Sequence, residues 1–284
     1  RSNLNEKNFS VMDWLWWYSF VLNNRKRLQY LLTMNVQLKF TILWCIFVFG
    51  SLFHDFMPLP PSYFSLRNNF FNVFFVKKGW GWTSGLLFAF LLSLLSKQKQ
   101  SNVIVCFKNI SRIFVLTLTW YLFTSFFETI ESYTGNCVGD NNLNIKEVCR
   151  NSGFLWNGFD ISGHCFLLTY CTLVINEELL ATMNVVIQIN NNDNNKLKKA
   201  YKFLGFDFSA VLFDWLIEFF SASLLLLMLL WEVMLFFTCA YFHTLMQKFL
   251  GVCFGLLAYY ICYRVIFILK HPLAPCEPGE FLII

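Results

Sequence analysis

The chain has 284 residues, of which 57% are apolar, 20% aromatic and only 14% charged. A soluble domain usually carries about 25% charged residues, so this composition excludes an ordinary soluble protein and predicts an integral membrane protein. The formal net charge of +5 is modest, and nothing in the sequence indicates a nucleic-acid-binding surface.

The N-terminal region, residues 1–36, precedes the first long apolar segment. Within it, residues 11–22 include three tryptophans and a tyrosine and are followed directly by the basic run Arg25–Arg27. The stretch is too short to span a bilayer, and aromatic residues beside basic ones are typical of the membrane interface. We therefore predict an aromatic interfacial helix in a cytosolic N-terminal region.

Six apolar segments are long enough to cross about 30 Å of hydrocarbon, which takes roughly 20 helical residues. They are residues 37–54, 79–96, 110–127, 162–189, 209–240 and 249–269. The third segment is short, with Arg112 near its start, whereas the fifth is longer than one span requires. Because a lipid-exposed backbone must satisfy its own hydrogen bonds, the sequence predicts an all-α membrane domain of six transmembrane helices over residues 37–270.

The distribution of Lys and Arg predicts the orientation of this domain. With six spans, 16 of these cations fall on the side of the two termini and 6 on the other side. The positive-inside rule therefore places both termini in the cytosol, together with the linker 190–208 and the tail 271–284. The longest loop on the opposite side, residues 128–161, contains Cys137 and Cys149, which an oxidising lumen would allow to form a disulfide. No cysteine or histidine spacing predicts a metal site, and no cofactor is expected.

Two of the four histidines fall on the same predicted face of the membrane. His164 begins the fourth span and His243 follows the fifth, whereas His54 and His271 are interpreted as incidental. Ser162 is well placed as the N-cap of the fourth span, and Gly163 allows close approach to the backbone. The free N–H groups of such a helical turn attract phosphate.

The surroundings of His243 favour a nucleophilic role. Gln247 lies four residues later and shares a face with His243 if that turn is helical. Its side chain could then hold one ring nitrogen and leave the other free to attack. Two imidazoles beside an anion-binding turn favour phosphoester or phosphoanhydride chemistry over acyl transfer. Lys77 and Lys78, at the same face, are either interfacial anchors or a phosphate clamp.

Three acidic residues near these spans are harder to interpret. Glu178 and Glu232 lie within apolar segments and are expected to form interhelical hydrogen bonds or to line a wet cavity. Asp160 precedes the fourth span and either orients His164 or faces water.

Six stretches, in order along the chain, resemble the fat storage-inducing transmembrane family. They are PLPPSYFS (58–65), NVFFVKKGWGWT (72–83), WYLFTSFFETIESYTGNC (120–137), GFDISGHCFLLTYC (158–171), INEEL (175–179) and YFHTLMQKFLG (241–251). The resemblance implies a protein of the endoplasmic reticulum membrane that promotes lipid-droplet formation. It also implies distant kinship with the lipid phosphate phosphatases and a helical bundle like theirs.

The resemblance further implies an activity and roles for both histidines. The substrate would be fatty acyl-CoA, cleaved at its diphosphate to acyl-4′-phosphopantetheine and adenosine 3′,5′-bisphosphate. His164 would protonate the leaving group and His243 would be the nucleophile, with the active site facing the lumen.

This chain departs from the phosphatase motifs at three positions. Phe236 and Phe237 stand where the third motif has Ser-Arg, and Gln247 stands where it has Asp. No first motif of the form Lys-x6-Arg-Pro is present, so Lys77 or Lys78 with backbone N–H groups would have to bind the phosphate.

Two other functions are compatible with the sequence. One is a non-enzymatic protein that binds diacylglycerol and triacylglycerol and partitions neutral lipid into droplets, for which the 35 phenylalanines are suited. The other is a transporter, which would usually show internal repeats; the sequence has none.

Overall fold

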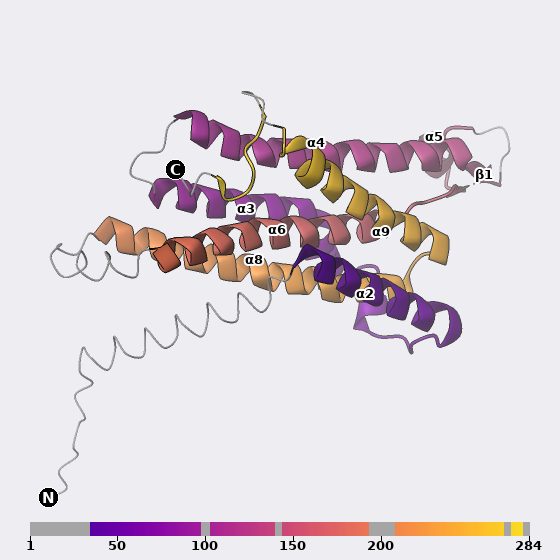
Figure 1. The fold of residues 1–284 in the computed structure, drawn as a ribbon. Coiled ribbons are helices and arrows are strands. Elements are labelled where there is room, and N and C mark those ends of the chain that lie inside the picture. Colours follow the sequence, from indigo (N-terminus) through magenta and orange to yellow (C-terminus); the bar gives the residue numbers. More distant parts are fainter. Residues whose placement is uncertain (1–34, 98–102, 140–143, 193–207, 270–273, 281–284) are drawn as a thin grey trace, which may run out of the picture.

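The computed structural model describes residues 35–97, 103–139, 144–192, 208–269 and 274–280. It contains six helices long and apolar enough to cross a membrane, as predicted. They are formed by α2 (Val36–Phe56), α3 (Gly79–Lys97), α4 (Val103–Thr134), α6 (Gly163–Asn192), α8 (Phe208–Tyr241) and α9 (Leu245–Tyr260). The second span begins at Phe71, in the helical turns before α3, and the sixth continues beyond α9 to Ile266. Figure 1 shows them as one elongated bundle with roughly aligned axes. The predicted interfacial helix at 11–22, most of the linker 190–208 and parts of the tail lie outside the described residues.

The boundaries differ from the predicted ones in two places. The third helix, α4, has 32 residues, because Asn109 and Ser111 bond to carbonyls within the helix and so do not interrupt it. The connection after α8 is only three residues long, 242–244. The chain between α2 and α3 forms short turns, η1 (Tyr63–Ser65), η2 (Phe71–Phe75) and η3 (Val76–Lys78), and α9 continues into η4 (Ile261–Ile266).

Helix α6 is the centre of the bundle. In its membrane-spanning part 83% of the residues are buried, against at most 50% in any other span. Figure 1 shows α6 running between α8 on one side and α3 and α4 on the other. Because this helix touches protein on all sides, any residue at its beginning is fixed by several neighbours at once.

Two glycines allow α9 to pack directly on α6. A Cβ on Gly251 would lie 2.6 Å from the carbonyl oxygen of Ser162, and one on Gly255 would lie 2.8 Å from Cβ of Thr169. Gly251 and Gly255 form a GxxxG pair, the spacing that lets helix backbones approach closely in membranes. This packing places the first turn of α9 against the first turn of α6.

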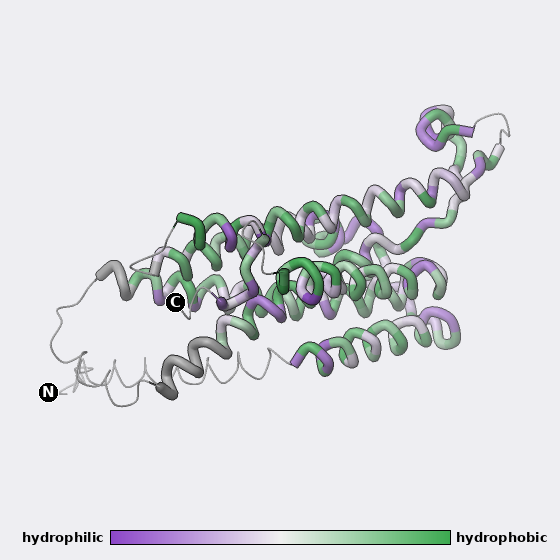
Figure 2. The backbone as a smooth tube through the Cα atoms, turned by 45° about the horizontal axis from the view of Figure 1, so that its top comes forward, coloured by the Kyte–Doolittle hydropathy of each residue, from purple (hydrophilic) through white to green (hydrophobic). Residues whose placement is uncertain are grey.

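Buried charges within the bundle are paired between helices, as predicted for Glu178 and Glu232. Glu232 on α8 forms an ion pair with Lys39 on α2 (2.7 Å). Glu178 on α6 accepts hydrogen bonds from Arg112 of α4 and from the Tyr263 hydroxyl, each at 2.9 Å. These pairs remove the cost of isolated charges at membrane depth. The colouring of Figure 2 shows apolar residues along all the helices, with hydrophilic segments mostly toward the helix ends and in the loops.

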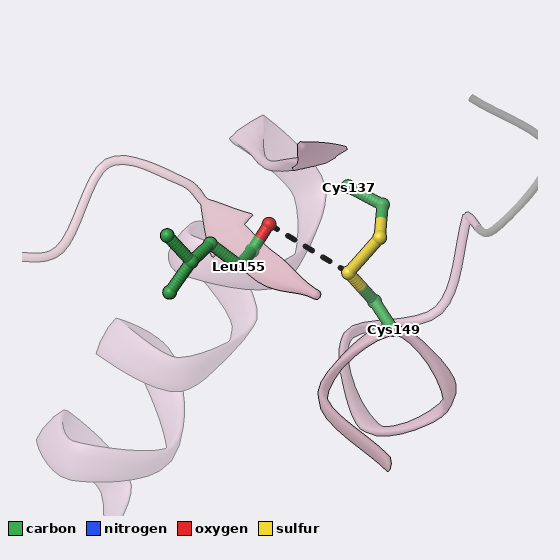
Figure 3. The surroundings of a disulfide bond; sticks show 3 residues. All are labelled: Cys137, Cys149 and Leu155. Carbon is green, nitrogen blue, oxygen red and sulfur yellow. Dashed lines mark hydrogen bonds between the residues drawn. A yellow bond between two sulfur atoms is a disulfide. The ribbon is translucent and has the colours of Figure 1, made fainter. Parts of the chain in front are cut away.

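The segment that joins α4 to α6, residues 135–161, is called the disulfide loop below. It contains β1 (Asn136–Val138), α5 (Lys146–Asn151) and β2 (Leu155–Asn157), and the two strands pair antiparallel, a small sheet that was not predicted. A disulfide joins Cys137 to Cys149, whose sulfur lies 3.7 Å from the Leu155 carbonyl oxygen (Figure 3). The loop is fixed to the end of α4, because Trp156 Nε1 donates to the Glu131 carbonyl (3.1 Å).

Candidate active site

A cavity of about 790 Å³ lies at the end of the bundle where α6 and α9 begin and α8 ends. This end is called the histidine end, because both His164 and His243 line the cavity. The other walls come from the turns before α3, from α4 and from the disulfide loop. The charged and polar lining residues are His54, Arg67, Asn69, Asn72, Lys77, Thr124, Glu128, Glu131, Lys146, Asp160, His164, Thr238, His243, Thr244 and Gln247. The structure therefore brings together the two histidines that the sequence placed on one face.

His164 lies in the first turn of α6. Ser162 caps this helix, since its Oγ accepts the Cys165 N–H at 3.3 Å, and its side chain is itself fully buried. Gly163 lines the cavity, and a Cβ on it would meet nothing within 4 Å. Nε2 of His164 is buried and has no hydrogen-bond partner among the described residues. A buried polar atom without a partner is unusual, and here it lies at a cavity.

His243 lies in the tight turn between α8 and α9. Its φ of 61° makes it the one non-glycine residue of the described chain with a positive φ. Such backbone strain is concentrated at functional sites. Lys248, fully buried, holds the turn by donating from Nζ to the Cys239 carbonyl near the end of α8 (2.9 Å). A cation at a helix C-terminus also interacts favourably with the helix dipole.

Gln247 has a further role besides the one predicted. Its side chain interacts with His243 and raises the pKa of that residue, as the predicted hydrogen bond would. In addition, Gln247 Oε1 accepts the Thr244 N–H (3.0 Å) in a capping box at the start of α9. Its main-chain carbonyl accepts the Ser162 N–H (3.1 Å). Gln247 thus connects the turn that carries His243 with the turn that carries His164.

Asp160 lies beside His243, a neighbour that neither sequence-based alternative named, and its side chain is 56% exposed. Its Oδ2 lies 4.0 Å from Nδ1 of His243, too long for a hydrogen bond but close enough for electrostatic attraction. Burial lowers the pKa of His243, while Asp160 and Gln247 oppose this shift. Burial likewise raises the pKa of Asp160, opposed by the charge of His243. The lowered pKa of His243 favours a neutral imidazole, with Nδ1 toward the carboxylate.

Three cations line the cavity. The positive charge of Arg67 lowers the pKa of His243. Lys77 interacts electrostatically with His164. Lys146 comes from the disulfide loop. Lys78, the alternative to Lys77, is not among the lining residues; its Nζ lies 5.9 Å from the centre of the Phe74 ring.

Sequence reasoning missed several of the lining residues. Arg67 was counted among the six cations of this face without being assigned a role, and Asn72 was noted only as part of a motif. His54, interpreted as incidental, lines the cavity and contacts Asp55 (2.6 Å).

The family model for fat storage-inducing transmembrane protein matches residues 60–132 and 127–263. The chain belongs to this family. It is 36% identical over 244 residues to the acyl-coenzyme A diphosphatase FITM2 of Xenopus tropicalis, covering 84% of each protein. It is 36% identical over 221 residues to the human protein of that name (75% of this chain, 76% of the relative). For the zebrafish (Danio rerio) protein the identity is 32% over 247 residues (84% and 88%).

Membership in the fat storage-inducing family agrees with the six helices and with both histidines, which lie inside the matched residues. No solved structure matches this chain, so the predicted likeness to the lipid phosphatase bundle stays a prediction. Within the described residues no group of three or more His, Cys, Asp or Glu side chains is placed to hold a metal ion.

Proposed function

We propose that this protein is an acyl-CoA diphosphatase, which hydrolyses fatty acyl-CoA to acyl-4′-phosphopantetheine and adenosine 3′,5′-bisphosphate. The observation that carries the proposal is one cavity in which His164 and His243, from separate turns, lie with the cations Arg67 and Lys77. The names of the relatives, acyl-coenzyme A diphosphatase, support the choice of substrate.

In the proposed mechanism, His243 is the nucleophile and His164 the acid. Nε2 of His243 attacks one phosphorus of the diphosphate, while Asp160 stabilises the positive charge that develops on the ring. The bridging oxygen leaves with the other phosphate and takes the proton from His164. Water then attacks the phosphohistidine and returns a proton to His164, so that the net reaction is hydrolysis.

Arg67 and Lys77 supply the phosphate clamp that the phosphatase motifs would otherwise provide. Both line the cavity and neither has an ion-pair partner within the described part of the chain. The guanidinium of Arg67 suits two phosphate oxygens at once. Fixed cations stabilise the charge of the transferring phosphoryl group without reorganisation. The position of the missing phosphatase arginine is occupied by Phe237, which stacks on Phe64 at 4.0 Å between ring centroids.

The apolar part of the same cavity suits the fatty chain. Its lining includes Phe64, Phe127, Met234, Phe237 and Phe242. Met234 lies within the membrane span of α8, so the cavity extends from charged residues toward residues at membrane depth. A substrate with a charged head and an apolar tail fits this division.

The location also belongs to the proposal. We place the protein in the endoplasmic reticulum membrane, with both termini in the cytosol and the cavity facing the lumen, where it supports lipid-droplet formation. The excess of cations on the side of the termini supports this orientation. The disulfide near the cavity supports it independently, since disulfides persist in oxidising compartments.

The non-enzymatic alternative, binding of diacylglycerol or triacylglycerol, is favoured by the same aromatic wall. It gives no role to the cations or to Nε2 of His164, which has no partner in the part of the chain that the structure describes.

Product analysis separates the two functions. Purified protein would be incubated with oleoyl-CoA and the products identified by mass spectrometry. We expect adenosine 3′,5′-bisphosphate and oleoyl-4′-phosphopantetheine from the wild type and neither from His243→Ala. Free oleate would indicate thioester cleavage instead, and no product from the wild type would favour the lipid-binding function.

A further inference from the structure

The cations at the histidine end form two groups. Arg67 and Lys77 come from the turns before α3. Arg67 interacts electrostatically with His243, and Lys77 with His164. Lys146 and Arg150 come from α5 of the disulfide loop and interact electrostatically with Asp160 instead. Lys146 therefore belongs to a different segment of the cavity wall from the clamp that the proposed mechanism uses.

Lys146 is the member of the second group that lines the cavity. Its Nζ lies 2.5 Å from Oε2 of Glu131 at the end of α4, and its side chain is 18% exposed. Arg150 contacts the other oxygen of the same carboxylate at 3.4 Å and is 58% exposed. The Glu131 carboxylate thus holds both cations of α5, and of the two it is Lys146 that lines the cavity.

The disulfide loop holds this group in a fixed position. The Phe159 N–H donates to Oγ1 of Thr134 (2.9 Å), and a Cβ on Gly158 would lie 2.3 Å from the Glu131 carbonyl oxygen. The Cys137–Cys149 disulfide joins α5 to β1, because Cys149 belongs to α5 and Cys137 to β1. A cation fixed in this way can recognise a ligand group at a set distance from the histidines.

The proposed substrate carries phosphate at two separate places. Its diphosphate, which is cleaved, must lie at the histidines, whereas its 3′-phosphate lies on the ribose at the far end of the nucleotide. We propose that Lys146, supported by Glu131 and Arg150, binds this 3′-phosphate and so selects CoA thioesters over their 3′-dephospho forms. The inference rests on the proposed function, because only that function brings a substrate with a second phosphate into the cavity.

The test compares two substrates, oleoyl-CoA and 3′-dephospho-oleoyl-CoA. The wild type should prefer oleoyl-CoA in kcat/KM, and Lys146→Gln should lose about 10-fold on oleoyl-CoA, as expected for one charge-assisted phosphate contact. The loss should appear in KM, and turnover of the dephospho substrate should not change. Lys78→Gln is the matched control, since it removes a cation that does not line the cavity.

Equal losses on both substrates would overturn the inference, because Lys146 would then act on the fold or on the diphosphate. An unchanged preference in Lys146→Gln would overturn it as well. A binding measurement separates this outcome from failure of the proposed function. By calorimetry, adenosine 3′,5′-bisphosphate should bind the wild type more tightly than adenosine 5′-monophosphate does, and Lys146→Gln should remove the difference. No binding difference in the wild type counts against the inference even if the enzyme is active.

Discussion

The two ends of the bundle both contain buried or half-buried charges, but they use them differently. At the end opposite the histidines, Arg112 is fully buried and both of its terminal nitrogens donate, to Glu178 (2.9 Å) and to the Glu277 carbonyl (3.1 Å). At the histidine end, Arg67 and Lys77 line a cavity and have no ion-pair partner among the described residues. The same residue types therefore stabilise the packing at one end, whereas at the other end they line a cavity that can hold a ligand.

This difference separates a structural role from a functional one. A buried charge whose partners are all protein groups makes the packing specific and rigid. Charges and imidazoles that converge on a cavity without being fully paired by protein groups are typical of an active site. Substitutions at the histidine end should accordingly lower activity, whereas substitutions at the opposite end should lower thermal stability.

Of the two ends, the larger effect on activity is expected at the histidine end, from His164→Ala. Loss of a general acid should lower kcat by roughly 10²- to 10⁴-fold. Thermal unfolding should change little, since Nε2 has no hydrogen bond within the described structure to lose. Steady-state kinetics and a melting curve on the same preparation test both halves. Wild-type turnover in this variant would contradict the assignment of the acid.

Arg112→Ala should give the reverse pattern. It leaves Glu178 buried without its cation, which typically costs about 3–5 kcal/mol. The protein should unfold at a lower temperature, with kcat per folded molecule close to that of the wild type. The double variant Arg112→Met with Glu178→Leu is the matched control and should recover much of the stability, because no lone charge remains. A normal melting curve with reduced kcat in Arg112→Ala would mean that this end is functional too.

The parts that were predictable from the sequence are those where one physical rule dominates. Apolar length is enough to find six spans, and helix-capping chemistry is enough to place Ser162 before α6. The length of α4 was underestimated, because Asn109 and Arg112 appear to interrupt an apolar run. In the folded protein the first bonds within its helix and the second pairs with Glu178.

The site was only half predictable for a related reason. His164 and His243 could be placed on one face by counting spans. Arg67 and Asp160 lie in irregular segments, and Lys146 begins the six-residue helix α5, so no periodicity indicates which way these side chains point. Their positions depend on tertiary contacts such as the bond from Ser162 to Gln247 and the pinning of the disulfide loop to α4.

A smaller effect is expected where α6 meets α9. In Gly251→Ala the new Cβ would lie 2.6 Å from the Ser162 carbonyl, so the first turn of α6 has to move. We expect a loss of about 1–3 kcal/mol in stability, as for other overpacked sites, and a lower kcat because His164 shifts with that turn. Gly85→Ala on α3 is the control, since its Cβ would meet nothing within 4 Å. Equal melting temperatures for the two variants would argue against this close packing.

The smallest effect, and the most specific, concerns the pH dependence of the histidine end. His243 must be neutral to attack, and burial already lowers its pKa from the ordinary 6.5. The charges that face it are Asp160, which raises the pKa, and Arg67 and Lys248, which lower it. Asp160→Asn removes the opposing charge, so the pKa of His243 should fall further and the acid limb of kcat/KM should move to lower pH.

The shift should be small, because Asp160 is 56% exposed and its charge is screened by solvent. Glu128→Gln is the control, since Glu128 lines the same cavity but is not among the charges that act on His243. If the acid limb disappears in Asp160→Asn instead of moving, the limb reports Asp160, whose own pKa burial raises. If it stays in place, Asp160 does not set the charge of the nucleophile, and the histidine end would resemble the Arg112 end in holding a carboxylate for structure alone.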